Sequence, residues 1–219
     1  MSDDPWRARL RALRVFSGEL PGFNTDAAPT DPIDLMKEWL SFAIDSEVSQ
    51  PHAMSIATVD SVAVPSVRTL LLKDLTADGL WFATMSNSPK GIDLANNPNA
   101  AVQFYWREHG RQVRFSGVVE QGDREMSEAD FLDRSTTARA VAIAGRQSAE
   151  QPALDIVDST IADARAILDF KPDYVPDEWT AYRLRPQTAE FWQAARKRDQ
   201  IRLKYSRSNG GWNRSLLWP

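Results

Sequence analysis

The chain contains no cysteine and only two histidines, His52 and His109, among its 219 residues. Without thiols it can form no disulfide, iron–sulfur cluster or cysteine nucleophile. Two histidines would also leave a zinc site dependent on carboxylates. We therefore expect no metal centre, and redox chemistry would require a bound organic cofactor.

Long apolar runs are also missing. No stretch approaches the roughly 18 consecutive apolar residues of a membrane span, and the charged segment Met1–Arg14 lacks the apolar core of a signal peptide. The 26 Lys and Arg are outnumbered by 30 Asp and Glu, so the chain lacks the basic excess of nucleic-acid binders. We expect a cytoplasmic protein that binds neither membranes nor nucleic acid.

The first 31 residues are expected to form an arm. Residues 6–14 could form a short basic amphipathic helix, and residues 17–32 contain several Gly, Pro, Asn and Asp. A solvated or subunit-contacting helix face is favoured over a membrane-binding or RNA-binding one. The remaining residues, 32–219, are long enough to bury one core and are expected to form a single domain.

Hydrophobic periodicity predicts a fold of strands, then helices, then strands. A helix is predicted from Pro32 to about Val48, capped by Asp31, and a short one over residues 89–95. Predicted strands cover residues 53–60, 63–73, 80–85, 101–106, 112–121, 179–185, 189–193, 201–205 and 211–217, with the first three in a meander and a hairpin turn at 208–211. Residues 127–170 are expected to be helical. This order predicts an α+β fold: an antiparallel, mostly β barrel with peripheral helices.

Five segments carry polar side chains where a ligand could bind, although each alone has an ordinary structural explanation. Neither GxGxxG nor GxxxxGK[ST] occurs, so side chains would have to recognise a phosphate. Lys90 lies in the first turn of a predicted helix, where unpaired amides favour an anion, although a plain N-cap explains the same residues. The segments are residues 68–73, 87–91, 111–114, 145–148 and 190–202.

Taken together and in order, these segments resemble the pyridoxine/pyridoxamine 5'-phosphate oxidase family. The resemblance runs from about Asp31 to Pro219 and rests on residues 68–73 (RTLLLK), 88–91 (SPKG), 104–106 (FYW) with 111–113 (RQV), 146–148 (RQS) and 190–193 (EFWQ). It implies a split β-barrel homodimer that binds flavin mononucleotide (FMN) at the subunit interface. The implied activity is oxidation of a small substrate in pyridoxal phosphate biosynthesis, with a hydride passing to FMN and then electrons to O2, giving H2O2.

The resemblance also implies the site residues, position by position. The implied FMN contacts are Arg68, Thr69, Lys73, Ala83, Thr84, Lys90, Gln112, Gln147, Ser148, Trp192 and Arg202. The implied substrate contacts are Lys73, Arg134, Arg198 and Gln200, with Arg198 as the catalytic residue beside the reacting carbon.

Four positions depart from the family pattern. Pro89 replaces an arginine beside the cofactor phosphate, and Gln200 replaces a histidine near the substrate. Asp130 and Ala138 stand where the family has two hydroxyl side chains on the substrate phosphate, so a carboxylate is added and a donor is lost. These departures leave two alternatives open: oxidation of a different small molecule, for example a phenazine-type precursor, or flavin binding without efficient turnover.

Overall fold

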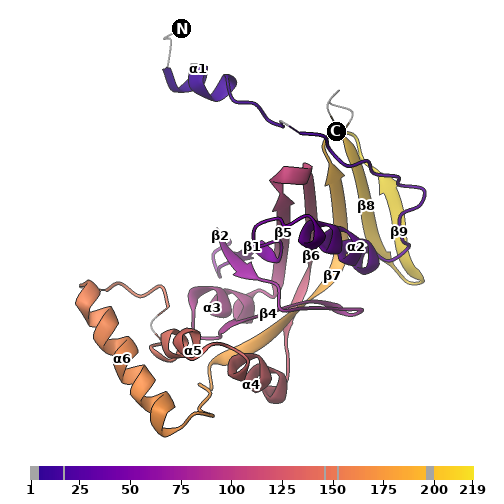
Figure 1. Cartoon of the computed structure of the whole chain (residues 1–219). Coiled ribbons are helices and arrows are strands. Elements are labelled where there is room, and N and C mark those ends of the chain that lie inside the picture. The colour runs from indigo at the N-terminus through magenta and orange to yellow at the C-terminus, as the bar shows by residue number, and fades with distance from the viewer. Residues whose placement is uncertain (1–4, 17, 146, 152, 196–199) are drawn as a thin grey trace.

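The computed structural model describes residues 5–16, 18–145, 147–151, 153–195 and 200–219. Its strands form one antiparallel sheet in the order β2-β1-β5-β6-β7-β4-β3, with β8 paired to β7 and β9 to β8 (Figure 1). The strands are β1 (Ala53–Val59), β2 (Pro65–Leu71), β3 (Asp74–Thr76), β4 (Gly79–Met85), β5 (Asn99–Trp106), β6 (Arg111–Gln121), β7 (Trp179–Gln193), β8 (Ile201–Ser208) and β9 (Gly211–Leu216). This sheet with helices around it confirms the predicted antiparallel split barrel of the α+β class.

The predicted three-stranded meander is wrong. β2 pairs with β1, but β4 pairs with β7 and with the short strand β3, which the sequence analysis missed. Every residue of β4 except the half-buried Ala83 is buried. A strand buried on both faces belongs inside the sheet, so β4 takes a neighbour from far along the chain.

The two strands predicted at 179–185 and 189–193 form one strand, β7, which pairs with β6 along its length. The register shifts where Ser116 lies opposite Thr188 and Gly117 opposite Pro186, so the strand passes its proline at a β-bulge. A Cβ on Gly117 would come within 2.0 Å of the Arg185 carbonyl oxygen. Only glycine fits this crossing, and β7 can then pair with β4 at one end and β8 at the other.

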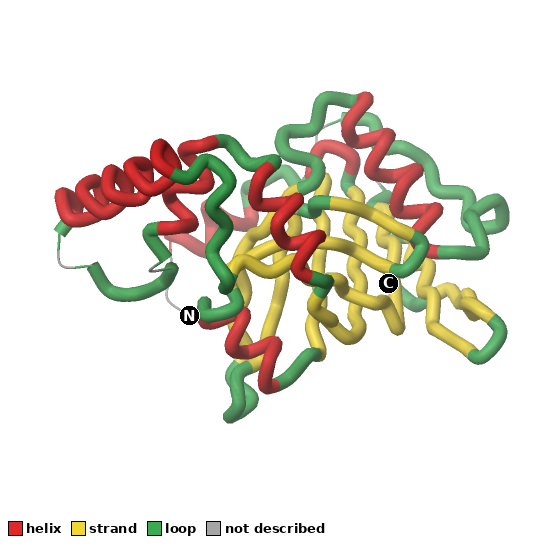
Figure 2. Tube along the Cα trace, turned by 90° about the horizontal axis from the view of Figure 1, so that it is seen from below, coloured by secondary structure: helices red, strands yellow, loops and turns green. Residues whose placement is uncertain are grey.

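Except for the first, the helices of the described residues gather around the sheet (Figures 1 and 2). They are α1 (Pro5–Arg11), α2 (Pro32–Asp45), α3 (Pro89–Asn96), α4 (Arg124–Leu132), α5 (Thr136–Ile143) and α6 (Leu154–Phe170), with a 3-10 turn at Arg107–His109. α2 begins as predicted, because the Asp31 carboxylate accepts a hydrogen bond from Ile33 N at 2.8 Å. Its buried face includes Trp39, which packs edge-to-face on Phe191 of β7.

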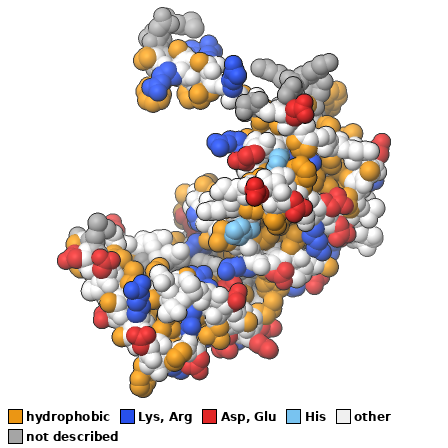
Figure 3. Space-filling model, viewed as in Figure 1, with side chains coloured by type: hydrophobic (Ala, Val, Ile, Leu, Met, Phe, Trp, Pro, Cys, Tyr) orange, Lys and Arg blue, Asp and Glu red, His pale blue; other side chains and the backbone are white. Residues whose placement is uncertain are grey.

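The segment before α2 is attached to strands β8 and β9 by side-chain hydrogen bonds to its backbone carbonyls. Tyr205 Oη donates to the Pro29 carbonyl at 2.8 Å, and Arg214 Nη1 donates to the Ala28 carbonyl at 2.6 Å. α1 buries none of its residues and stands away from the sheet, with basic and apolar side chains mixed on its surface (Figure 3). Within the described residues, no helix is long and apolar enough to cross a membrane.

Candidate functional site

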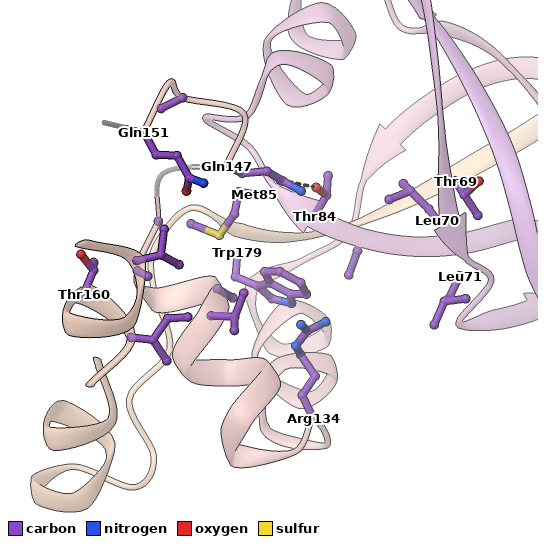
Figure 4. A pocket seen from close by; sticks show the side chains of 18 of the residues that line it. Thr69, Leu70, Leu71, Thr84, Met85, Arg134, Gln147, Gln151, Thr160 and Trp179 are labelled. Carbon is purple, nitrogen blue, oxygen red and sulfur yellow. Dashed lines mark hydrogen bonds between the residues drawn. The ribbon is translucent and has the colours of Figure 1, made fainter. Parts of the chain in front are cut away.

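A cavity of about 470 Å³ opens between β2, β4 and the helices α5 and α6 (Figure 4). Six of the predicted site residues line it: Thr69, Lys73, Ala83, Thr84, Arg134 and Gln147. Trp179, the first residue of β7, also lines the cavity. The structure therefore gathers residues that are far apart in the sequence around one space.

Lys90 lies buried at one end of this cluster, with 5% of its surface exposed. Its Nζ donates to Thr84 Oγ1 and Gln147 Oε1, both at 3.0 Å, and to Ser88 Oγ at 3.2 Å. All three acceptors are neutral, and among the described residues Lys90 has no ion-pair partner. Burial, and then the charge of Arg68, lower the pKa of Lys90 to about 8. An anion entering this site would supply the missing counter-charge.

The start of α3 places this lysine. Ser88 caps the helix by accepting a hydrogen bond from Gly91 N at 3.4 Å, and Pro89 occupies the first turn. A Cβ on Gly91 would lie 2.3 Å from the Ser86 carbonyl oxygen, so the chain packs closely just before the helix. Pro89 therefore serves the helix start and cannot itself contribute a charge.

Arg68, on β2, is held by three residues that the sequence analysis missed. Its Nη1 donates to Thr58 Oγ1 at 2.7 Å, and Thr58 Oγ1 donates to Asp93 Oδ2 at 2.6 Å. Ser66 accepts a second hydrogen bond from the guanidinium, and the Asp93 carboxylate lies 4.0 Å from Arg68 Nη2. No sequence motif links strands β1 and β2 with helix α3, so this support was visible only after folding.

The predicted FMN contacts Gln112, Trp192 and Arg202 form a second group. They lie on adjacent strands in direct register, Gln112 opposite Trp192 and Trp192 opposite Arg202. Trp192 Nε1 donates to Gln200 Oε1 at 2.9 Å, so the structure brings the predicted substrate residue Gln200 to this group. None of these four side chains lines the cavity.

Glu190 holds Arg202 of this second group in place. Arg202 Nε donates to Glu190 Oε1 at 2.9 Å, and Arg114 donates to the other carboxylate oxygen. Burial alone would raise the pKa of Glu190, but the hydrogen bonds from Arg202 and Arg114 lower it overall. The charged run that the sequence showed around residues 190–202 is thus partly an internal ion-pair network.

The predicted substrate residues Lys73 and Arg134 also line the cavity, and we call the part of it around these two residues and Trp179 the substrate end. Lys73 Nζ lies 3.3 Å from Asp130 Oδ1, and Trp179 Nε1 donates to Asp130 Oδ2 at 3.0 Å. The guanidinium of Arg134 lies over the Trp179 ring, 4.4 Å from its centroid. Burial lowers the pKa of Arg134, and the charge of Asp130 opposes that shift.

The positions of Ala138, Ser148 and Arg198, also named by the sequence analysis, differ in how far the structure describes them. Arg134 Nη2 donates to the main-chain carbonyl of Ala138 at 3.1 Å, a contact that does not require a hydroxyl there. Ser148 follows the cavity-lining Gln147 with a left-handed backbone, φ 67°. Arg198 lies outside the described residues.

Two family models match consecutive parts of the chain. Residues 40–168 match the model described as pyridoxamine 5'-phosphate oxidase. Residues 179–219 match the model of the pyridoxine 5'-phosphate oxidase C-terminal dimerisation region. The chain belongs to the pyridoxamine 5'-phosphate oxidase family. Recognition from the five sequence segments is confirmed.

Curated relatives of this family match almost the whole chain. A pyridoxine/pyridoxamine 5'-phosphate oxidase of Polaromonas sp. is 39% identical over 211 residues, covering 96% of this chain and 97% of the relative. One of Acidovorax sp. is 38% identical over 219 residues and covers both chains completely.

Solved structures of the family show the same fold. PhzG from Burkholderia lata, in complex with tetrahydrophenazine-1-carboxylic acid, has a TM-score of 0.85 and 30% identity, covering 92% of this chain and 100% of PhzG. An FMN-binding protein from Nostoc punctiforme has a TM-score of 0.70 at 18% identity, covering 86% of this chain and 97% of that protein. This second likeness supports the split-barrel fold alone.

Proposed function

We propose that this protein is an FMN-dependent oxidase that works as a homodimer. The observation that carries the proposal is the buried Lys90 ammonium, which has only neutral acceptors around it and Arg68 nearby. A buried cation without a counter-ion is costly unless a ligand supplies one. The phosphate of FMN fits this requirement, and Arg68 and Lys90 would hold it.

The second group of predicted cofactor residues supports the dimer. Gln112, Trp192 and Arg202 do not line the cavity in their own chain, and two of them lie within the matched dimerisation region. We infer that a second copy brings its own Gln112, Trp192 and Arg202 to complete the site. Within one chain, Thr69, Ala83, Thr84, Gln147 and Ser148 would provide the rest of the cofactor's surroundings.

The chemistry supplied by bound FMN is transfer of a hydride from the substrate, followed by transfer of electrons to O2 with formation of H2O2. The chain's own residues bind and orient. Lys73 and Arg134 would hold the substrate's anionic group, and Arg198 would contact the reacting end of the substrate. The same proposal places the protein in the cytoplasm, with residues 32–219 as one domain behind an N-terminal arm.

Two substrates deserve testing. A pyridoxine or pyridoxamine 5'-phosphate is the first, because the curated relatives carry that activity in their names, and pyridoxal phosphate biosynthesis would then be the role. A different small molecule is the second, because Lys73 is already ion-paired with Asp130 and is less available to a substrate phosphate. PhzG, whose structure contains a phenazine-type carboxylic acid, shows that such a molecule can be bound on this fold.

The test is anaerobic reduction of the flavin. The protein is reconstituted with FMN, and pyridoxine or pyridoxamine 5'-phosphate is added while the visible flavin absorbance is followed. Rapid bleaching with formation of pyridoxal phosphate would support the first substrate, whereas bound flavin that stays oxidised would favour the second. Failure to bind FMN at all would refute the proposal.

Two variants separate binding from turnover in the same assay. Arg198→Ala should keep FMN bound and slow substrate-dependent bleaching, whereas Lys90→Ala should weaken FMN binding. Loss of FMN from Arg198→Ala would contradict this division of roles.

A further inference from the structure

The substrate end of the cavity has an unusual balance of charge. Among the described residues, the charged side chains that line the cavity are Lys73, Arg134 and Glu150. At the end formed by Lys73 and Arg134, Asp130 places a carboxylate 3.3 Å from Lys73 Nζ. Two cations against one carboxylate leave this end with about one net positive charge, which matches a monoanion better than a doubly charged anion.

Asp130 is fixed in this position. Its side chain is 16% exposed, and its second oxygen accepts a hydrogen bond from Trp179 Nε1 at 3.0 Å. Trp179 itself is buried at the start of β7 and packs edge-to-face on Phe131, the residue after Asp130. Moving the carboxylate away from Lys73 would therefore also leave a buried indole N–H without its acceptor, which is unfavourable.

Arg134 is the one described cation at this end that is not ion-paired. It stacks on Trp179, and one nitrogen is engaged by the Ala138 carbonyl. Its Nε is buried and has no hydrogen-bond partner among the described residues. A stacked guanidinium with an unused donor suits one additional anionic or polar oxygen.

The remaining wall is mostly apolar. Side chains from β2, β4, α5 and α6 form it: Leu70, Leu71, Ala83, Met85, Val141, Ala142, Ile156, Val157 and Ile161. Such a wall accommodates a flat ring and makes desolvation of a highly charged group expensive. The apolar wall and the charge balance thus point to the same class of ligand.

We propose that the Lys73–Arg134 end of the cavity binds a planar aromatic ligand carrying one negative charge, such as a ring carboxylate, and disfavours a phosphate dianion. The Lys73–Asp130 pair is the feature that sets this preference. The inference rests on the proposed function in taking this cavity as the substrate's side of the flavin site, but its charge preference can be measured without turnover.

Two probes with the same ring isolate the charge. Naphthoate is a monoanion, and naphthyl phosphate is a dianion at about pH 8. Each is titrated calorimetrically at low salt into the FMN-loaded full-length protein and into flavin-free Lys90→Met protein, in which the Lys90 charge cannot attract the phosphate. The wild-type protein should bind naphthoate about tenfold more tightly than naphthyl phosphate.

Asp130→Asn is the decisive variant. Its amide oxygen can still accept the Trp179 N–H, but the negative charge beside Lys73 is gone. Naphthyl phosphate should bind this variant about tenfold more tightly than it binds the wild type. Naphthoate should gain by a smaller factor, because the repulsion from Asp130 is about twice as large for a dianion as for a monoanion. Asp163→Asn, on the exposed side of α6, is the matched control and should change neither affinity.

Lys73→Met provides a second variant if Asp130→Asn does not fold. It leaves the Asp130 carboxylate without a counter-ion, so both probes should bind more weakly. The proposal is overturned if naphthoate does not bind, if the wild type binds naphthyl phosphate at least as tightly, or if the Asp130 or Lys73 change leaves the affinities unaltered. Failure of FMN to bind would instead refute the oxidase proposal, while the ratio of the two probes would still be measured on flavin-free Lys90→Met protein, in which the buried Lys90 charge cannot attract the phosphate.

Discussion

Replacing Lys90 with methionine should stabilise the flavin-free protein and weaken FMN binding. Burial lowers the pKa of this lysine from 10.5 to about 8, which corresponds to a cost of about 3 kcal/mol for keeping it charged at neutral pH. Methionine removes that charge at similar length, but Thr84 and Gln147 lose a donor. We expect a net gain of about 1–3 kcal/mol in the free energy of unfolding.

The pH dependence follows from the same shift. Because the folded-state pKa lies below that of the unfolded chain, the unfolded chain holds more protons between about pH 8 and 10.5. The free energy of unfolding of the flavin-free wild type should therefore rise across this window, and the full penalty is present below pH 8. Lys90→Met should remove this rise.

A phosphate beside Lys90 raises its pKa again, so FMN binding near pH 8 should take up protons. Calorimetric titrations with FMN in buffers of different ionisation enthalpy measure this uptake, and thermal or urea unfolding measures stability. Lys37→Met, on the exposed side of α2, is the control and should change neither quantity. The reasoning is refuted if Lys90→Met destabilises the flavin-free protein or leaves FMN affinity and proton uptake unchanged.

Two further predictions concern the support and the sharing of the site. Asp93→Asn should loosen the Thr58–Arg68 arrangement and weaken FMN binding about tenfold with little effect on substrate affinity, whereas an unchanged dissociation constant would show that Asp93 does not position Arg68. Mixing Lys90→Met chains with Trp192→Ala chains should restore flavin binding in the mixed dimers, because one of the two sites then contains neither change; mixtures as inactive as the separate variants would contradict a shared site.

Local sequence rules were sufficient for most elements. The Asp31–Pro32 pair and the apolar spacing after it located the start of α2, because capping and amphipathicity act within a few residues. Alternation located β1, β5 and β6 for the same reason. The split of β7 was wrong because Pro186 is an interruption in local terms, and only the bulge opposite Gly117 makes it compatible with a continuous strand.

The candidate site was partly readable in advance. Order and spacing of the motifs identified the family. The resemblance also pointed to Arg68, Thr84, Lys90 and Gln147, which the structure gathers around the Lys90 ammonium. The separation of Gln112, Trp192 and Arg202 from the cavity could be recognised only in the structure. The pairing of Asp130 with Lys73 also required the structure, since α4 and the end of β2 are far apart in sequence.

The sequence by itself thus determined where α2 starts, where β1, β5 and β6 lie and which family the chain belongs to. The tertiary structure decided that β4 pairs with β7, that Asp93 supports Arg68 and that Asp130 neutralises Lys73. Periodicity reports that one face of an element is apolar, but it contains no information on which distant element covers that face. Contacts between distant residues depend on how all the elements pack together. The Lys73–Asp130 ion pair, which sets the charge of the cavity beside it, is such a contact.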